Sequence, residues 1–167
     1  MEGAHTLGDD VRLIRVGPAE RAVVEALRLA DDQTNLVASN VESLAEADED
    51  ADARPRAVVA GGRIVGFLMY ELFAGGRAAN IYRFMIDRAE QGRGYGRAAL
   101  ARLLAEIAAE PGVEEIEICY MPENVGARRL YAEAGFVEIG LDEDGEIIAR
   151  RAVDRGGGSG TAEGSPR

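Results

Sequence analysis

The segment QGRGYG, at positions 91–96, places three glycines in five positions directly before an alanine-rich stretch with the pattern of a helix. Glycine loses more backbone entropy on folding than other residues, so this cluster indicates that something must approach the backbone closely. The first N–H groups of a helix lack partners within the helix, and the helix dipole adds positive potential, so a phosphate group fits there. A tight strand-to-helix turn without a ligand would explain the same glycines. The residues concerned are Gln91, Gly92, Arg93, Gly94, Tyr95, Gly96 and Arg97.

Two common phosphate-binding loops do not fit this segment. A Walker A loop needs a lysine after its last glycine, and the chain contains no lysine, so that class of nucleotide hydrolase is excluded. A dinucleotide-binding fingerprint has the spacing G-x-G-x-x-G and opens a parallel strand–helix–strand unit. Here the spacing is G-x-G-x-G and the loop follows antiparallel-looking strands, so dinucleotide binding is not expected.

A second motif, NVGARRLYAEAGF, lies at positions 124–136, one strand beyond the glycine loop. Together the two motifs resemble the GNAT family of N-acetyltransferases. The loop is similar to the family's acetyl-CoA motif Q/R-x-x-G-x-G/A, and the second segment is similar to its helix N-x-x-A-x-x-x-Y-x-x-x-G-F. The matching helix residues are Asn124, Ala127, Tyr131, Gly135 and Phe136. The segments GGRIVGFLMYELF, YRFMID and RLYAEAGF further resemble bacterial spermine/spermidine N-acetyltransferases within that family.

The resemblance implies that acetyl-CoA is the acetyl donor and lies in a cleft where two central strands separate. Main-chain groups of Met85 and Ile86 would pair with the pantetheine arm, and the N–H groups from Gln91 to Arg97 would hold the pyrophosphate. The Asn124 side chain would hydrogen-bond the pantetheine. Its position directly before a helix also fits an N-cap, and the two roles are compatible.

Tyr131 is the general acid that the resemblance implies, because the coenzyme leaves as a thiolate when an amine attacks the thioester. Such assistance is typically worth about 10²–10⁴-fold in rate. The alternative is a tyrosine that packs on one helix face with its hydroxyl satisfied nearby.

The general base is less well defined. A primary amine with a pKa near that of lysine, about 10.4, must lose a proton before it attacks. Many family members have a carboxylate at the position of Tyr82, which is a poor base at neutral pH. Glu71 on the neighbouring strand, Glu123 through a water molecule, or an ordered water chain would then take its place.

A polyamine acceptor needs carboxylates spaced along a groove, each paired with an ammonium group. In this family the helices near the N-terminus form one wall of the acceptor site. The candidates there are Asp31, Asp32, Gln33 and Asn40, together with Glu42 and Glu46. A solvated helix face explains most acidic residues equally well. Neither His5 nor Cys119 shows metal-ligand spacing, and no metal is expected.

The elements that must position these residues follow from hydrophobic periodicity and turn signals. We expect an α+β domain over residues 11–154, with a mixed, mostly antiparallel sheet of about seven strands, about four helices and a splayed strand pair, as in the GNAT fold. Residues 1–10 are expected to be flexible, and 155–167 to form a disordered Gly/Ser-rich tail. Strands are expected over 11–18, 56–60, 63–73, 77–87, 113–121, 136–141 and 146–153, and helices over 19–30, about 34–47, 97–110 and 123–136.

The net charge of −11 argues against nucleic-acid or anionic membrane partners and suits a small cationic substrate, although a solubilising acidic surface explains it too. A single cysteine excludes an internal disulfide and favours a reducing, cytoplasmic compartment.

The leading interpretation is acetyl-CoA-dependent N-acetylation of spermidine or spermine. Alternatives are another acceptor (an aminoglycoside, an amino acid or a protein N-terminus) or a non-catalytic acyl-CoA sensor. By analogy with the family, an apolar strand edge near the C-terminus could support a homodimer.

Overall fold

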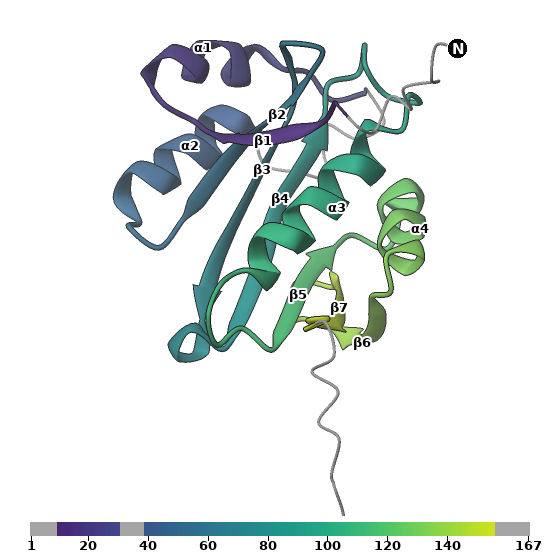
Figure 1. Ribbon diagram of the computed structural model, residues 1–167. Coiled ribbons are helices and arrows are strands. Elements are labelled where there is room, and N and C mark those ends of the chain that lie inside the picture. Colours follow the sequence, from purple (N-terminus) through teal and green to yellow (C-terminus); the bar gives the residue numbers. More distant parts are fainter. Residues whose placement is uncertain (1–9, 31–38, 156–167) are drawn as a thin grey trace, which may run out of the picture.

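A seven-stranded sheet organises the chain, and the computed structural model describes residues 10–30 and 39–155 (Figure 1). The expected α+β fold is confirmed. The expected flexible N-terminus and tail lie, apart from Asp10 and Arg155, outside the described residues. The elements are β1 (Arg12–Arg15), α1 (Pro18–Ala26), α2 (Asn40–Glu49), β2 (Arg54–Ala60), β3 (Arg63–Phe73), β4 (Ala78–Ile86), α3 (Tyr95–Ala108), β5 (Glu115–Tyr120), α4 (Val125–Glu133), β6 (Val137–Leu141) and β7 (Ile147–Ala152), with a 3₁₀ turn at Ala74–Gly76.

The sheet has the order β1-β2-β3-β4-β5-β7-β6, and every neighbouring pair is antiparallel except β4 with β5. The parallel β4–β5 ladder is short: it joins Ala78–Ile81 to Glu115–Ile118. Beyond it, β4 continues to Ile86 and β5 to Tyr120. The strands therefore separate toward their carboxyl ends, as the splayed pair requires.

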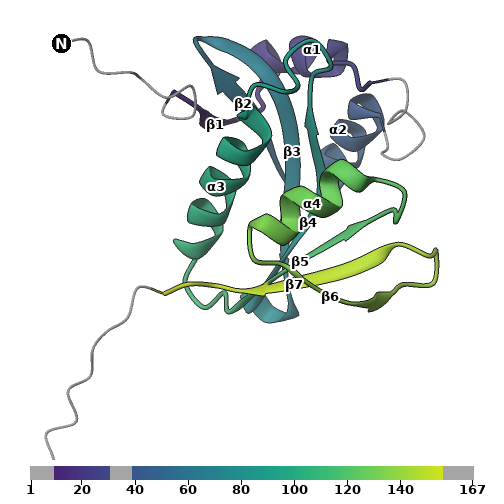
Figure 2. The same ribbon diagram turned by 90° about the vertical axis from the view of Figure 1, so that its right-hand side faces the viewer.

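Both faces of the sheet are covered, because side chains along a strand alternate between them. On one face Phe67 and Met69 of β3 pack with Val24 of α1 and Leu44 of α2. On the other face Leu68 and Tyr70 pack with α3, which contributes Leu100, Leu103 and Ile107. Figures 1 and 2 show α1 and α2 on one side of the sheet and α3 on the other. None of the described helices has the length and apolar character needed to cross a membrane.

The boundaries of the first two helices differ from the expected ones. Helix α1 ends at Ala26 instead of continuing to position 30. Helix α2 begins at Asn40, because Ser39 caps it: its hydroxyl accepts from the N–H of Glu42, whose carboxylate accepts from the N–H of Ser39. This Ser-x-x-Glu capping box is visible in the sequence and marks the helix start. Positions 34–38 of the expected helix lie outside the described residues.

Candidate active site

A cavity of about 180 Å³ lies between the end of β4, the start of α3 and the start of α4. We refer to it as the first cavity. It brings together most of the predicted cofactor-binding residues, although these come from three separate elements. Those that line it are Met85, Ile86, Gln91, Gly92, Gly94, Tyr95, Gly96 and Asn124.

The glycine loop forms one wall of the first cavity in a conformation that needs glycine. Gly92 and Gly94 have φ of +78° and +84°, and no atom lies within 4 Å of where a Cβ would stand on either. Gly94 is also the N-cap of α3, whose first N–H groups have no partner within the helix. The Gln91 amide donates to the carbonyl of Ile86 (3.0 Å), which ties the loop to the end of β4. The loop is thus an open cradle with the properties of an anion site.

The two predicted loop arginines do not line the first cavity. Arg97 pairs with Glu133 of α4, and Arg93 lies 3.5 Å from a carboxylate oxygen of Glu90. Glu90 is buried, lines the cavity and also pairs with Arg63 (3.0 Å). Its side chain therefore holds two arginines beside the loop, a contact that the motif alone does not reveal.

A second cavity, of about 290 Å³, lies where β4 and β5 separate. It shares Phe84, Asn124, Ala127 and Tyr131 with the first cavity, so the two cavities meet at these side chains. A ligand in one can therefore contact a ligand in the other beside Tyr131. The polar and charged residues found only in the second cavity are Asn80, Tyr82, Arg83, Cys119, Tyr120 and Glu146.

Tyr131 lies in an aromatic setting between the cavities. Its ring contacts Phe84, Tyr120 and Phe136, with centroid distances of 6.3, 5.2 and 5.9 Å. Burial, with a smaller effect of Tyr120, raises the pKa of the Tyr131 phenol well above its ordinary value. The phenol therefore stays protonated near neutral pH, as a proton donor must. Among the described residues none hydrogen-bonds its hydroxyl.

Asn124 caps helix α4, because its side-chain oxygen accepts from the N–H of Ala127 (3.2 Å). The amide nitrogen has no protein partner among the described residues, and Asn124 lines both cavities. The N-cap role is thus observed, and the geometry leaves a donor for a ligand.

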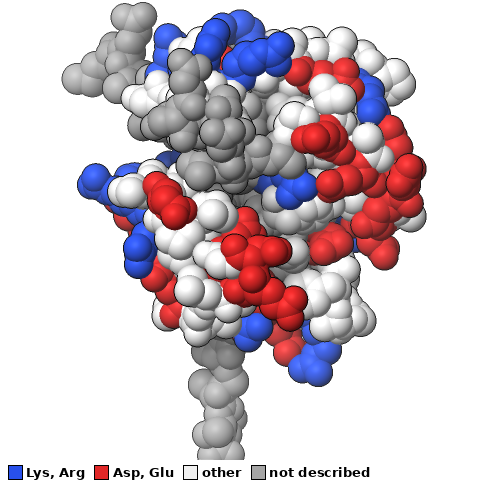
Figure 3. All heavy atoms as spheres, turned by 180° about the vertical axis from the view of Figure 1, so that it is seen from behind, with Lys and Arg blue, Asp and Glu red and all other residues white. Residues whose placement is uncertain are grey.

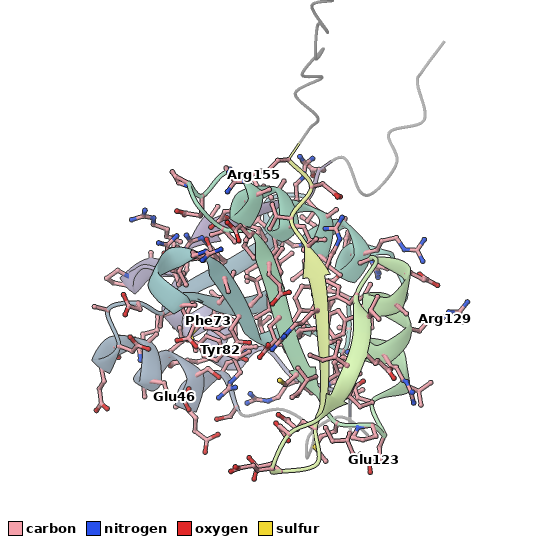
Figure 4. The ribbon with its side chains drawn as sticks, turned by 90° about the horizontal axis from the view of Figure 1, so that it is seen from below. Glu46, Phe73, Tyr82, Glu123, Arg129 and Arg155 are labelled. Carbon is pink, nitrogen blue, oxygen red and sulfur yellow. The ribbon has the colours of Figure 1, made fainter. Side chains whose placement is uncertain are left out.

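The three candidate bases occupy different positions. Tyr82 lines the second cavity, and burial, followed by the charges of Glu71 and Asp50, raises its pKa to about 12. Glu71 accepts a hydrogen bond from the amide of Asn80 (3.4 Å), and Asn80 lines that cavity. Glu123 is exposed and lines neither cavity, and Figure 4 shows it far from Tyr82 in that view. Glu71 itself lines neither cavity, but its carboxylate lies within hydrogen-bond reach of the cavity residue Asn80.

Of the predicted amine-binding residues, Asp31, Asp32 and Gln33 lie outside the described residues. Asn40 is buried, and its amide donates to the carbonyl of Val24 (2.9 Å) and to the sulfur of Met85 (3.7 Å). It joins α2 to α1 and β4 and lines neither cavity.

Acidic side chains gather on the side of the molecule where α2 lies, as Figure 3 shows in red. One of them, Glu46, pairs with Arg83 of β4 (3.2 Å). Figure 4 shows Glu46 and Tyr82 on the same side of the sheet in that view. The carboxylate of Glu46 thus lies next to Arg83, a residue of the second cavity.

Sequence reasoning missed Asn80, Tyr120, Cys119 and Glu146, which line the second cavity. Their joint position depends on the strand order β4-β5-β7, which no local motif encodes.

Donor atoms of Cys119, Asp142 and Glu146 lie within 4.8 Å of one another. Burial and nearby carboxylates raise the pKa of the Cys119 thiol to about 11, which disfavours the thiolate that binds metals. The expectation of no metal stays a prediction.

Comparisons with known proteins agree with this geometry. Residues 23–136 match the acetyltransferase (GNAT) family. The chain is 32% identical over 135 residues to the spermine/spermidine N(1)-acetyltransferase of Bacillus subtilis (strain 168), and the alignment covers 77% of this chain and 89% of that protein.

Solved structures share the fold at lower identity. A spermidine N-acetyltransferase from Vibrio cholerae in complex with CoA and spermine has a TM-score of 0.71 at 21% identity, covering 87% of this chain and 96% of that chain. The aminoglycoside acetyltransferase AAC(6')-Ib in complex with coenzyme A has a TM-score of 0.73 at 16% identity, covering 85% and 94%. The family match, the extent of the Bacillus alignment and the fold together establish that the chain belongs to the acetyltransferase (GNAT) family and is an N-acetyltransferase.

Proposed function

We propose that this enzyme moves an acetyl group from acetyl-CoA to a primary amine of a small polycation, with spermidine and spermine as the acceptors. The single observation that carries the proposal is the meeting of two cavities at Tyr131. Acetyl transfer needs a donor and an acceptor to approach one another at a proton donor, and this arrangement provides for both.

The first cavity fits acetyl-CoA. Its diphosphate needs converging N–H donors with no side chains in the way, which the positive-φ glycines and the start of α3 provide. The edge of β4 beyond Ile81 is released from β5, so Met85 and Ile86 present a strand edge toward the cavity. The Asn124 amide adds a donor. When bound, acetyl-CoA supplies a thioester that an amine can attack.

The second cavity fits a cationic acceptor. Its lining includes the carboxylate of Glu146, and the net charge of −11 attracts polycations over a distance. The Bacillus relative is named for spermine and spermidine, which supports the same acceptor class. Aminoglycosides are the second candidate, since they too are polyamines and the fold resembles an aminoglycoside acetyltransferase.

Tyr131 acts as the general acid in this proposal. Its phenol is protonated when the amine attacks, and it donates a hydrogen bond toward the leaving sulfur. The low dielectric of the buried site strengthens this bond as negative charge develops on sulfur. The thiolate takes up the phenol proton, and the proton lost by the amine restores the phenol by way of water. The amine loses its proton to water in the second cavity, and Glu71, whose carboxylate accepts a hydrogen bond from the cavity residue Asn80, takes up the proton from this water. Attack is direct, without an acetylated enzyme intermediate.

Thiol release from acetyl-CoA tests the proposal, with spermidine, spermine, short diamines, an aminoglycoside and several amino acids as acceptors. We expect turnover with polyamines, and in Tyr131→Phe a loss of about 10²-fold or more in kcat with KM for acetyl-CoA little changed. Tyr70→Phe is a matched control, because the Tyr70 hydroxyl donates to Glu106 (2.7 Å) and Tyr70 lines neither cavity. Tight acetyl-CoA binding without thiol release for any amine would favour a non-catalytic sensor.

The cellular setting and assembly are also proposals. We place the enzyme in the cytoplasm, supported by its single, free cysteine, and expect no nucleic-acid partner because of its negative charge. Strand β6 is an edge of the sheet that exposes Val137, Ile139 and Leu141. A homodimer through this edge remains a prediction.

A further inference from the structure

The second cavity has two charged side chains in its lining, Arg83 and Glu146. Arg83 is already engaged: its guanidinium donates to the Ser43 hydroxyl (2.9 Å) and the Tyr82 carbonyl (2.7 Å) and pairs with Glu46. The Glu146 carboxylate makes no hydrogen bond or ion pair with any residue that the structure describes. It is therefore the anionic group of the cavity that remains free to receive a cation.

The turn between β6 and β7 fixes the position of Glu146. The Glu146 N–H donates to a carboxylate oxygen of Asp142 (2.8 Å), and the Asp142 N–H donates to the Glu146 carbonyl (2.9 Å). Gly145, with φ of +82°, allows the chain to turn between them. A carboxylate oxygen of Glu146 lies within 4.8 Å of the Cys119 sulfur on β5. The backbone of this acid is thus held in place before a ligand arrives.

The charges around Glu146 favour a cation at this point. Burial, then the charges of Asp142 and Asp144, raise the pKa of the Glu146 carboxyl, whereas the charge of Arg83 lowers it. An ammonium group placed there is attracted by the carboxylates of Glu146, Asp142 and Asp144 and repelled by the Arg83 guanidinium, which is itself paired with Glu46.

Glu146 is absent from the residues that the two cavities share. The attacking nitrogen must reach the thioester beside Tyr131, where the cavities meet, so Glu146 faces a different part of the acceptor. We propose that Glu146 binds a second ammonium group of the acceptor and so selects amines with two or more positive charges. This inference rests on the proposed function, because it assumes acetyl transfer in the second cavity.

The test compares spermidine with n-butylamine, which has an amine to acetylate but no second ammonium. In Glu146→Gln we expect kcat/KM for spermidine to fall by about 10-fold or more, and for n-butylamine by less than about 3-fold. Glu143→Gln is the matched control: it removes the same charge from the same turn, but its exposed side chain lies outside the cavity lining. An unchanged KM for acetyl-CoA verifies that each variant is folded.

Three results would overturn the inference. Equal losses with both amines would place Glu146 at the attacking nitrogen. Equal losses in Glu146→Gln and Glu143→Gln would assign the effect to general charge. No loss would remove Glu146 from acceptor binding. Failure of the proposed function is distinct, because the wild-type enzyme would then show no turnover with spermidine, and the inference would fall with it.

Discussion

At the scale of single residues, burial decides what two phenols next to the second cavity can do. Tyr131 and Tyr82 both have raised pKa values, and for both the largest cause is burial. A raised pKa favours the protonated form, which suits a proton donor and disqualifies a base. Tyr131 thus has the protonation state of an acid, and Tyr82 lacks that of a base near neutral pH.

We predict that Tyr82→Phe leaves the pH dependence of kcat/KM unchanged. The Tyr82 pKa is about 12, so the phenol is neutral throughout the range where the enzyme is assayed and cannot contribute the ascending limb of the profile. Glu71→Gln should instead lower kcat/KM by about 10-fold or more if the carboxylate assists deprotonation. Rates measured between about pH 6 and 10 with a single polyamine check both variants. If the ascending limb of the pH profile of kcat/KM shifts in Tyr82→Phe, Tyr82 does take part in deprotonating the amine.

At the scale of elements, the loop before α3 depends on backbone geometry. We predict that Gly94→Ala raises KM for acetyl-CoA by about 10-fold or more, because its φ of +84° strains alanine and a methyl group enters the open cradle. The measurement is KM for acetyl-CoA at saturating acceptor, with thermal unfolding in parallel.

Gly62→Ala is the matched control for that experiment. Gly62 has φ of +75° in the β2–β3 turn, and no atom lies within 4 Å of the Cβ position. It should lose similar stability, of the order of 1–2 kcal/mol, yet keep its KM. Equal KM values in both variants would show that the loop glycines serve the fold alone.

Local motifs predict the residues of the first cavity but not those of the second. The glycine loop and the residues around Asn124 and Tyr131 are local motifs, so their spacing predicts the first cavity and its lining. Glu146 reaches the second cavity only because β7 pairs with β5, and that pairing depends on long-range contacts. The sequence pattern therefore predicts an acceptor site on helices, whereas the second cavity, proposed to hold the acceptor, is lined largely by strand residues. The tyrosine at position 82, where the family resemblance leads us to expect a carboxylate, is the one local feature that predicts a different residue as the base.

At the scale of the whole molecule, the net charge of −11 should govern how the enzyme meets its acceptor. We predict that KM for spermidine rises several-fold when NaCl is raised from about 0.05 to 0.5 M, because salt shortens the Debye length from more than 10 Å to less than 8 Å. KM for n-butylamine, with one charge, should change less. Steady-state assays at fixed pH give both values. A spermidine KM that does not respond to salt would mean that the acidic surface plays no part in capture.

The short ladder between β4 and β5 has a consequence for the lifetime of the protein. A sheet that stops pairing at Ile81 leaves strand edges to be completed by a ligand, and in the proposed function acetyl-CoA completes the edge at Met85 and Ile86. A ligand that binds only the folded state adds about 2.7 kcal/mol of stability at 100 times its dissociation constant. Resistance of the enzyme to unfolding and proteolysis would then follow the supply of its own donor, so that a cell poor in acetyl-CoA also retains less of the enzyme that consumes it.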